Sequence, residues 1–353
     1  MVDLGGAAQR TADQLAEERA GVVVAALADG RAEIRSAGAV ATDTVFELGS
    51  VSKVFTSLAL AVLVTEGLVE LDQPVAEVLP EAAGLHRRGE SVTLRQLAQH
   101  TSGLPRLPHG MLLPALLNPG RPDPYAKLTE PVLLGTLRRT RLGAVPGSRF
   151  RYSNLGAGLL GLALARRAGT DYEGLIADRI TGPLGLVDTA VTPADPSRPA
   201  QGHDRRGRPV PGWDLAALAG AGGLRGTAAD LVTFLEAQLA PEQTPLAEAI
   251  ALSRTPEHRM NPFSWIHLGW MGQRLHLRQG GHLQLWHNGG TGGFSSFLGF
   301  DPGAGTGVVV LTNTQRSVDG SAGALLTDLS TAVGDSTAGG PADDSTAAGQ
   351  EVR

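Results

Sequence analysis

The run Phe46-Glu47-Leu48-Gly49-Ser50-Val51-Ser52-Lys53 leads directly into the apolar stretch 54–64. A glycine separates its short β-prone segment from a helix that the apolar pattern predicts over residues 51–66. Ser50 and Lys53 are three residues apart at the start of this helix, so their side chains lie on one face about a turn apart. The helix amino terminus also places free N–H groups and a partial positive charge beside Ser50. This junction therefore suits a serine nucleophile with an amine next to it.

An ordinary structural role is open to both residues, with Ser50 as a helix cap and Lys53 as a surface lysine. Two features favour a functional Lys53. The stretch 54–64 is almost wholly apolar, so the helix is expected to be buried on most sides, and a buried amine has a lowered pKa and can act as a base. The chain also has 28 Arg but only two Lys, Lys53 and Lys127, and a guanidinium cannot give up a proton at neutral pH.

Tyr152-Ser153-Asn154 lies in a loop before a helix predicted to start near Leu155, in a chain with only three Tyr. A phenolate is a credible base only where cations lower its pKa, and Lys53 is the candidate for that effect. The alternative is structural, with Tyr152 as a half-buried packing residue and Asn154 as the cap of the next helix.

His287-Asn288-Gly289 follows the apolar run 283–286 and precedes Gly290 and further glycines. Such a glycine-rich strand end leaves the backbone open to close approach by a ligand. The alternative is that Asn288-Gly289 forms a hairpin turn, with His287 flanking it. The remaining histidines lack a metal-ligand spacing such as His-x-x-x-His, so no metal site is predicted.

The chain has 353 residues, with 30 Lys and Arg against 35 Asp and Glu, a net charge of −5 and no Cys. Without Cys, the chemistry must come from hydroxyls, amines, imidazoles or carboxylates. The acidic balance argues against a nucleic-acid partner. The longest apolar run, residues 58–64, is too short to span a bilayer, and the first ten residues do not resemble a secretory signal. A cytoplasmic protein without a membrane partner is therefore expected.

The first part of the chain predicts a helix over 6–19 and a hairpin whose strands, 21–27 and 31–37, flank the turn dipeptide Asp29-Gly30. Helices predicted in the middle span 73–79, 93–100, 130–140, 155–168, 171–181, 227–239 and 245–254. Later strands are predicted over 266–272, 274–278, 283–286, 294–300 and 308–312. A last helix over about 317–333 precedes residues 334–353, which hold almost no large apolar residue and are expected to be disordered.

Strands near both ends of the chain, with helices between them, predict an α/β (α+β) sandwich. Its antiparallel β-sheet is built from both ends and flanked by helices, and the middle forms an inserted all-helical lobe. The predicted α/β domain comprises residues 1–72 plus 256–333, the mainly helical domain comprises 73–255, and 334–353 form the disordered tail. A cleft between the two lobes is the natural place for a site.

Taken together, the three motifs resemble those of the serine β-lactamase and penicillin-binding-protein superfamily, most closely its class C β-lactamase and family VIII esterase branch. The run 46–53 is similar to that branch's nucleophile motif across its whole length. Further similar stretches are Leu97-Ala98-Gln99-His100-Thr101-Ser102-Gly103-Leu104, Pro146-Gly147, and Ala221-Gly222-Gly223-Leu224 before Thr227. The resemblance spans about residues 15–333 and implies a β-lactamase/transpeptidase-like fold.

The resemblance also implies a role for each motif residue. Ser50 would be the acylated nucleophile and Lys53 its partner. Tyr152 would be the general base in acylation and would pass the proton to the leaving group, although in such sites either Lys53 or Tyr152 can be the base. Asn154 would hold the substrate and the Lys53 amine by hydrogen bonds. The oxyanion hole would use the backbone N–H groups of Ser50 and Gly290.

At the third motif this chain departs from the class C β-lactamases that it resembles. They have Lys-Thr-Gly there, whereas this chain has His287-Asn288-Gly289. In this respect it is similar to esterases, transacylases and some D-amino-acid peptidases of the superfamily, in which the motif lies on a strand lining the cleft. A mostly uncharged His287 is a weaker anchor than a lysine for the carboxylate that β-lactams carry. The departure therefore favours ester, thioester or amide substrates.

These residues predict a serine acyl-transfer enzyme, an esterase or transacylase, that works through a Ser50 acyl-enzyme and needs no cofactor. Its partners would be a small-molecule acyl donor and an acceptor or water, because the same covalent intermediate serves both outcomes. The alternatives are a β-lactamase or D-Ala-D-Ala carboxypeptidase and, third, a non-enzymatic binding protein on the same fold. The sequence leaves the oligomeric state open.

Overall fold

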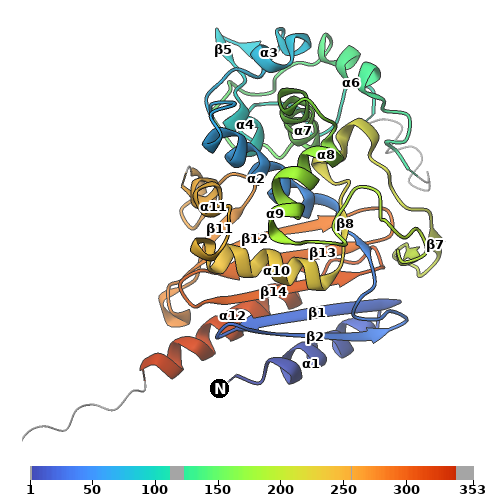
Figure 1. The fold of residues 1–353 in the computed structure, drawn as a ribbon, viewed down its shortest axis with the longest axis vertical. Helices are drawn as coiled ribbons and strands as arrows, with labels where there is room; N and C mark the ends of the chain where they lie inside the picture. The colour runs from blue at the N-terminus through green and yellow to red at the C-terminus, as the bar shows by residue number, and fades with distance from the viewer. Residues whose placement is uncertain (1, 112–122, 256, 339–353) are drawn as a thin grey trace, which may run out of the picture.

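The computed structural model describes residues 2–111, 123–255 and 257–338, with side chains as far as residue 333. In this part of the chain, eight antiparallel strands form a central sheet in the order β2-β1-β14-β13-β12-β11-β10-β9 (Figure 1). Their bounds are β1 Gly21–Ala28, β2 Arg31–Gly38, β9 His258–Asn261, β10 Ser264–Ile266, β11 Met271–Arg274, β12 Leu283–Gly290, β13 Ser295–Asp301 and β14 Thr306–Thr312.

β1 and β14 join the two ends of the chain in this sheet, with Val22 opposite Thr312 and Leu27 opposite Gly307. β1 and β2 form the predicted hairpin, and the turn residues Asp29 and Gly30 have φ values of 54° and 67°. Positive φ at both positions is what a tight two-residue hairpin requires. The expected antiparallel sheet, built from both chain ends and flanked by helices, is confirmed.

Helices cover both faces of the sheet, which explains why β1 is apolar at every position and buried along its whole length. Alternate β1 residues, beginning with Val22, pack against α1 (Leu4–Ala16) and α12 (Asp319–Ala338). The others, beginning with Val23, belong to a second core that includes α10 (Ala228–Leu239) and α2 (Ser52–Thr65). Figure 1 shows α1 and α12 on one side of the sheet and α10 on the other. Successive side chains of a strand point to opposite faces, so covering both faces demands an unbroken apolar run.

α2 is the central helix of the molecule, and its side chains are buried from Ser52 to Leu63. α7 (Asn154–Ala168), α11 (Ala247–Arg254) and the 3₁₀ segment η4 (Ala216–Ala221) pack around it. A helix that is apolar on all sides must be enclosed by other elements, as the sequence of α2 predicts. The start of α2 is therefore anchored on both sides, between the helices and the sheet.

The remaining helices that the structure describes in the middle region are short. They are α3 Val75–Val78, α4 Leu94–Ala98, α6 Glu130–Leu137, α8 Tyr172–Ile176 and α9 Gly182–Leu184. Three small antiparallel pairs accompany them: β3 Phe46–Glu47 with β8 Arg225–Gly226, β4 His86–Arg87 with β5 Glu90–Ser91, and β6 Gly202–His203 with β7 Pro209–Val210. The helix expected over 171–181 is divided into α8 and a π-helical segment, Ala177–Thr181. α10 lies within the span assigned to the helical domain, yet it packs on the sheet against β14.

Two predicted strands have the wrong bounds. The segment 266–272 is not one strand, because β10 ends at Ile266, β11 begins at Met271 and a turn joins them. The turn residues Leu268 and Trp270 are almost fully buried, so their apolar character imitates a strand. The segment 274–278 is not a strand either, since it contains the end of β11 and the start of a 3₁₀ turn, Leu277–Gln279.

α12 extends five residues into the segment 334–353 that was expected to be disordered, since it ends at Ala338. Adding residues to an existing helix costs little, because the unfavourable step is its nucleation. The rest of that segment, residues 339–353, lies outside the described residues. Neither α12 nor any other described helix combines the length and the apolar character needed to cross a membrane.

Candidate active site

Ser50 lies in a short 3₁₀ turn, η1 (Gly49–Val51), that runs straight into α2. Its side chain caps neither helical segment, so the cap alternative is wrong. The Nζ atom of Lys53 donates to Ser50 Oγ at 2.9 Å and to the carbonyl oxygen of Ala221 at 2.5 Å. The structure therefore brings Ser50 and Lys53 into direct contact, as their spacing predicts.

Lys53 is only 2% exposed, so it is not a surface lysine. Burial lowers the pKa of its amine well below the usual value, and the Arg106 cation lowers it further. A charged amine loses its hydration when it is buried, whereas the neutral form loses much less. The neutral amine is an effective proton acceptor beside the Ser50 hydroxyl.

Glycines allow the end of β12 to approach the nucleophile turn. A Cβ atom on Gly49, whose φ is +51°, would lie 2.7 Å from the nitrogen of Gly290. A Cβ atom on Gly289 would lie 2.1 Å from the carbonyl oxygen of Leu48. Both contacts are shorter than any side chain tolerates, so the two backbones meet only because these residues are glycines. The packing places Gly289 and Gly290 next to Ser50.

The stretch after η4 holds the nucleophile motif from another side. The Leu224 N–H donates to Ser52 Oγ at 3.0 Å, and the Leu48 N–H donates to the Leu224 carbonyl oxygen at 2.9 Å. Lys53 also donates to Ala221 in the same stretch. These contacts together attach the residue after β3, the turn η1 and the start of α2 to the segment that ends η4 and follows it.

Tyr152 lies against both Ser50 and Lys53. The Lys53 Nζ atom is 5.0 Å from the centre of the Tyr152 ring, and a side-chain hydrogen bond joins Tyr152 to Ser50. Burial raises the pKa of Tyr152 to about 12, although the Ser50 bond and the Arg106 cation act in the opposite direction. Burial therefore outweighs the effect of nearby cations, and the phenolate form of Tyr152 is not favoured. Tyr152 keeps its proton at neutral pH.

Asn154 is the first residue of α7, and Ser153 is the residue that caps this helix, accepting the Gly156 N–H at 2.9 Å. The cap alternative for Asn154 is therefore wrong. A side-chain hydrogen bond joins Asn154 to Tyr125, whereas no bond joins it to Lys53 in the described part of the chain. The Oδ1 atom of Asn154 is buried and has no partner among the described residues, so it can accept a hydrogen bond from a ligand.

His287 lies within β12, which continues to Gly290, so Asn288-Gly289 does not form a hairpin turn. The imidazole is fully buried, and its Nδ1 atom is 2.6 Å from the Asn288 carbonyl oxygen. This contact assigns the proton to Nδ1 and leaves Nε2, which has no partner in the described part of the chain, as an acceptor. Burial, with a smaller effect of Lys53, lowers the pKa of His287 to about 3. The third motif therefore presents a neutral ring.

Two residues beside the site were not singled out from the sequence. The His100 ring centre lies 4.4 Å from that of Tyr152, and the central guanidinium carbon of Arg106 lies 5.3 Å from the same ring. His100 belongs to the stretch 97–104, which only the family resemblance marks as a motif. The spacing of His100 from Tyr152 in the sequence does not indicate that their rings meet, because the contact arises from the packing of distant segments.

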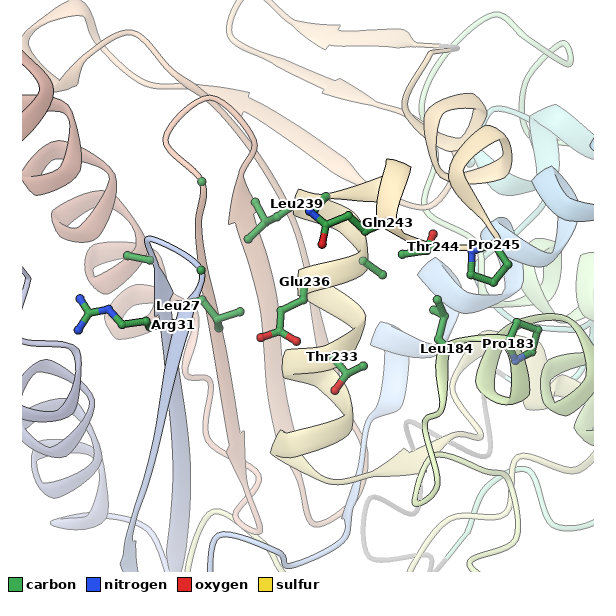
Figure 2. Close-up of a pocket in the computed structure, with 15 residues that line it drawn as sticks. Leu27, Arg31, Pro183, Leu184, Thr233, Glu236, Leu239, Gln243, Thr244 and Pro245 are labelled. Atoms are coloured by element: carbon green, nitrogen blue, oxygen red, sulfur yellow. The ribbon is translucent and has the colours of Figure 1, made fainter.

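The pocket in Figure 2, of about 530 Å³, lies between the end of β1, α10 and the segment 183–184, and neither Ser50, Lys53, Tyr152, Asn154 nor His287 lines it. Among the described residues, no three or more His, Asp or Glu side chains are grouped so that they could hold a metal ion. The serine, lysine, tyrosine and histidine cluster is therefore the candidate site.

Residues 8–332 match the family model Beta-lactamase. A Beta-lactamase of Pseudomonas fluorescens is 27% identical over 336 residues, which cover 84% of this chain and 89% of that protein. The D-alanyl-D-alanine-carboxypeptidase/endopeptidase AmpH of Escherichia coli (strain K12) is 30% identical over 310 residues, covering 82% and 77% of the two chains. A class C beta-lactamase of known structure shares the fold, with a TM-score of 0.77, 23% identity and coverage of 93% and 96%.

Proposed function

The chain belongs to the beta-lactamase family of serine hydrolases, and on that premise we propose that it is an esterase or transacylase working through a Ser50 acyl-enzyme. Its donor is an ester, thioester or amide, and its acceptor is water or a second small molecule. The 2.9 Å contact between Lys53 Nζ and Ser50 Oγ carries this proposal, because a serine nucleophile needs a base within hydrogen-bond reach.

Lys53 is the base in this scheme because its pKa is lowered by burial while that of Tyr152 is raised. The neutral amine takes the Ser50 proton as Oγ attacks the acyl carbonyl carbon. The charge that develops on the carbonyl oxygen is stabilised by the backbone N–H groups of Ser50 and Gly290, which the glycine contacts bring together.

Tyr152 serves as the acid that completes acylation. Its hydroxyl proton passes to the leaving group as the bond from the acyl carbon to that group breaks. The Lys53 ammonium, beside the Tyr152 ring, then returns a proton to the phenolate, so both residues recover their starting states. Deacylation runs these steps in reverse, with water or the acceptor hydroxyl in place of the departed leaving group. Tyr152, after passing its proton to Lys53, takes a proton from the attacking hydroxyl, and the Lys53 ammonium returns a proton to Ser50 Oγ as the bond from Oγ to the acyl carbon breaks.

The neutral His287 supports ester, thioester or amide substrates over β-lactams. A β-lactam carries a carboxylate, and recognition of a carboxylate is strongest with a cation. His287 is buried and its pKa is lowered to about 3, so it supplies no positive charge at neutral pH. It can instead accept a hydrogen bond at Nε2 from a neutral substrate.

A second candidate is a β-lactamase or D-Ala-D-Ala carboxypeptidase, and Arg106 is the observation that favours it. The guanidinium of Arg106 lies over the Tyr152 ring, and the residue is exposed. It can therefore offer a carboxylate the charge that His287 lacks. The names of the relatives from Pseudomonas fluorescens and Escherichia coli point in the same direction.

Parallel assays with p-nitrophenyl acetate and nitrocefin separate the candidates. Ester turnover well above nitrocefin turnover, with one acetyl group added to the intact protein, is expected. Ser50→Ala must lose both turnover and adduct, while Ser148→Ala, at an exposed serine, must retain them. Ester turnover that survives in Ser50→Ala would overturn the mechanism. Rapid nitrocefin turnover would favour the second candidate instead.

A further inference from the structure

We propose that His100 is a positioning residue for Tyr152, holding the backbone on both sides of the tyrosine so that its hydroxyl stays on Ser50. The inference rests on the proposed function, in which Tyr152 delivers a proton to the leaving group. The stretch 97–104 supplies none of the reacting groups, and its role in this proposal is to hold Tyr152 in place.

The contacts of His100 enclose Tyr152 from before and after it in the sequence. The Arg151 N–H donates to the His100 carbonyl oxygen at 2.7 Å. The Ser153 N–H donates to the Nδ1 atom of the His100 ring at 3.3 Å. Between these two bonds, the His100 ring lies tilted over the Tyr152 ring, with 4.4 Å between their centres. One residue thus fixes the position and the direction of the Tyr152 backbone and also contacts its ring.

The residues that follow His100 extend the same support to the rest of the motif. The Arg106 carbonyl oxygen accepts the Asn154 N–H at 3.0 Å and the Leu155 N–H at 3.2 Å. The Ser153 hydroxyl donates to the Pro105 carbonyl oxygen at 2.7 Å. The first turn of α7 is therefore attached to one continuous segment that begins at His100. Residues before and after Tyr152 cannot shift without breaking bonds to that segment.

The backbone of His100 is itself unusual, with a φ of +55°. Residues other than glycine seldom adopt this left-handed conformation, and asparagine is among the few side chains that tolerate it. Glycine would fit such a backbone without strain. What His100 adds beyond a glycine at this position is its ring, with the acceptor atom Nδ1.

The bond from Ser153 also decides which form of the ring is useful. Nδ1 accepts a hydrogen bond, so the ring must be neutral with its proton on Nε2. Nε2 is buried and has no partner among the described residues. A position needed only for packing would be better filled by an apolar ring, since a buried polar atom without a partner is unfavourable. The acceptor atom Nδ1 is what the histidine contributes.

Two substitutions separate the ring acceptor from the backbone conformation. His100→Gly keeps the left-handed backbone and removes the acceptor and the ring. His100→Asn also suits the backbone, and its Oδ1 atom occupies the place of Nδ1, so it can accept the Ser153 N–H. Asp29→Gly is the matched control, because Asp29 has a φ of +54° in the β1–β2 turn, outside the site.

The experiment measures kcat and KM with an alkyl ester such as ethyl acetate, whose alkoxide leaving group must take a proton, together with hydrogen exchange at the Ser153 amide. For His100→Gly, kcat is expected to fall about 10- to 100-fold while KM stays within about twofold, because misplacing a proton donor affects the chemical step. His100→Asn is expected to recover most of this loss, and Asp29→Gly to behave as the wild type. Hydrogen exchange at the Ser153 amide should be faster in His100→Gly and close to normal in His100→Asn.

A wild-type kcat in His100→Gly would overturn the proposal, and so would a His100→Asn variant as slow as His100→Gly. If His100→Gly does not fold, His100→Asn still tests the proposal. Asparagine lacks the ring, so a His100 needed only for packing predicts that His100→Asn is inactive, whereas the role as an acceptor predicts that it is active. If the wild type does not turn over the ester, the proposed function fails. Hydrogen exchange at the Ser153 amide still reports on His100 in that case, because it needs no substrate.

Discussion

Gly49 packs against Gly290 so closely that a Cβ atom on Gly49 would lie 2.7 Å from the Gly290 nitrogen. One residue belongs to the turn that carries the nucleophile, and the other ends a strand from the far end of the chain. The contact sets the distance between the two backbone segments proposed as the oxyanion hole. An increase of about 1 to 2 Å in this distance would separate two N–H donors that must converge on one oxygen atom.

Gly49→Ala is therefore expected to reduce both stability and activity. The new methyl group would meet the Gly290 backbone, which cannot move aside as a flexible side chain can, and alanine is strained at a φ of +51°. We expect a loss of about 2 to 4 kcal/mol in the free energy of unfolding, measured with urea, together with loss of ester turnover.

Gly67→Ala separates the strain from the clash. Gly67 has a φ of +70°, and its added Cβ would meet nothing within 4 Å. We expect it to lose about 1 kcal/mol of stability and to keep full activity. Equal activity in Gly49→Ala and Gly67→Ala would show that the Gly49 contact does not matter for catalysis.

Tyr152→Phe removes the hydroxyl that delivers a proton to the leaving group. A drop in kcat of about 10²- to 10⁴-fold is expected with an alkyl ester such as ethyl acetate, whose alkoxide leaving group must be protonated, the range typical of a lost general acid. Tyr172→Phe is the matched control, because the Tyr172 hydroxyl bonds to Thr56 at 2.7 Å, and Tyr172 has no proposed part in the reaction. It should cost about 1 kcal/mol of stability and leave kcat unchanged. Wild-type kcat in Tyr152→Phe would remove this tyrosine from the mechanism.

The fold was largely predictable because its main signals are local. The Asp29-Gly30 dipeptide specifies a hairpin, and the unbroken apolar run of α2 specifies a buried helix. The errors arise where burial imitates secondary structure. Leu268 and Trp270 are apolar because their turn packs into the core, and a pattern of apolar residues cannot distinguish that turn from a strand.

The sequence predicts those features of the site that lie within one motif, but not those that depend on how distant segments pack. The spacing of Ser50 and Lys53 fixes their contact within one helix, so the 2.9 Å bond follows from the sequence. The protonation of Tyr152 does not, because it depends on how deeply the packing of distant segments buries the hydroxyl. The bonds that the Arg151 and Ser153 N–H groups donate to His100 join segments that are distant in the sequence, and no local pattern encodes them.

Acid should destabilise the protein through His287. Its pKa is about 3 in the folded chain and ordinarily about 6.5, so below pH 6.5 the unfolded chain takes up a proton that the folded chain does not. The free energy of unfolding therefore falls as the pH drops from about 6.5 towards 3, by at most about 1.4 kcal/mol per pH unit for this group. Urea unfolding at pH 7.5 and pH 5.5 measures the change.

His287→Asn isolates that contribution, since it should lose about 1 kcal/mol less than the wild type between the two pH values. His109→Asn, at an exposed histidine, should follow the wild type. A His287→Asn variant with an undiminished pH dependence would mean that the folded protein accommodates a charged His287.

Lys53→Arg tests whether the lysine acts as a base or only as a cation. The substitution keeps a side chain that can donate to Ser50, but a guanidinium cannot lose its proton at neutral pH. If the neutral amine of Lys53 removes the Ser50 proton, ester turnover should fall by at least about 10²-fold. Lys127→Arg is the natural control, because the chain has only these two lysines and Lys127 is exposed. Turnover in Lys53→Arg close to that of Lys127→Arg would exclude Lys53 as the base. The proton would then have to leave Ser50 through Tyr152, against the raised pKa of that hydroxyl.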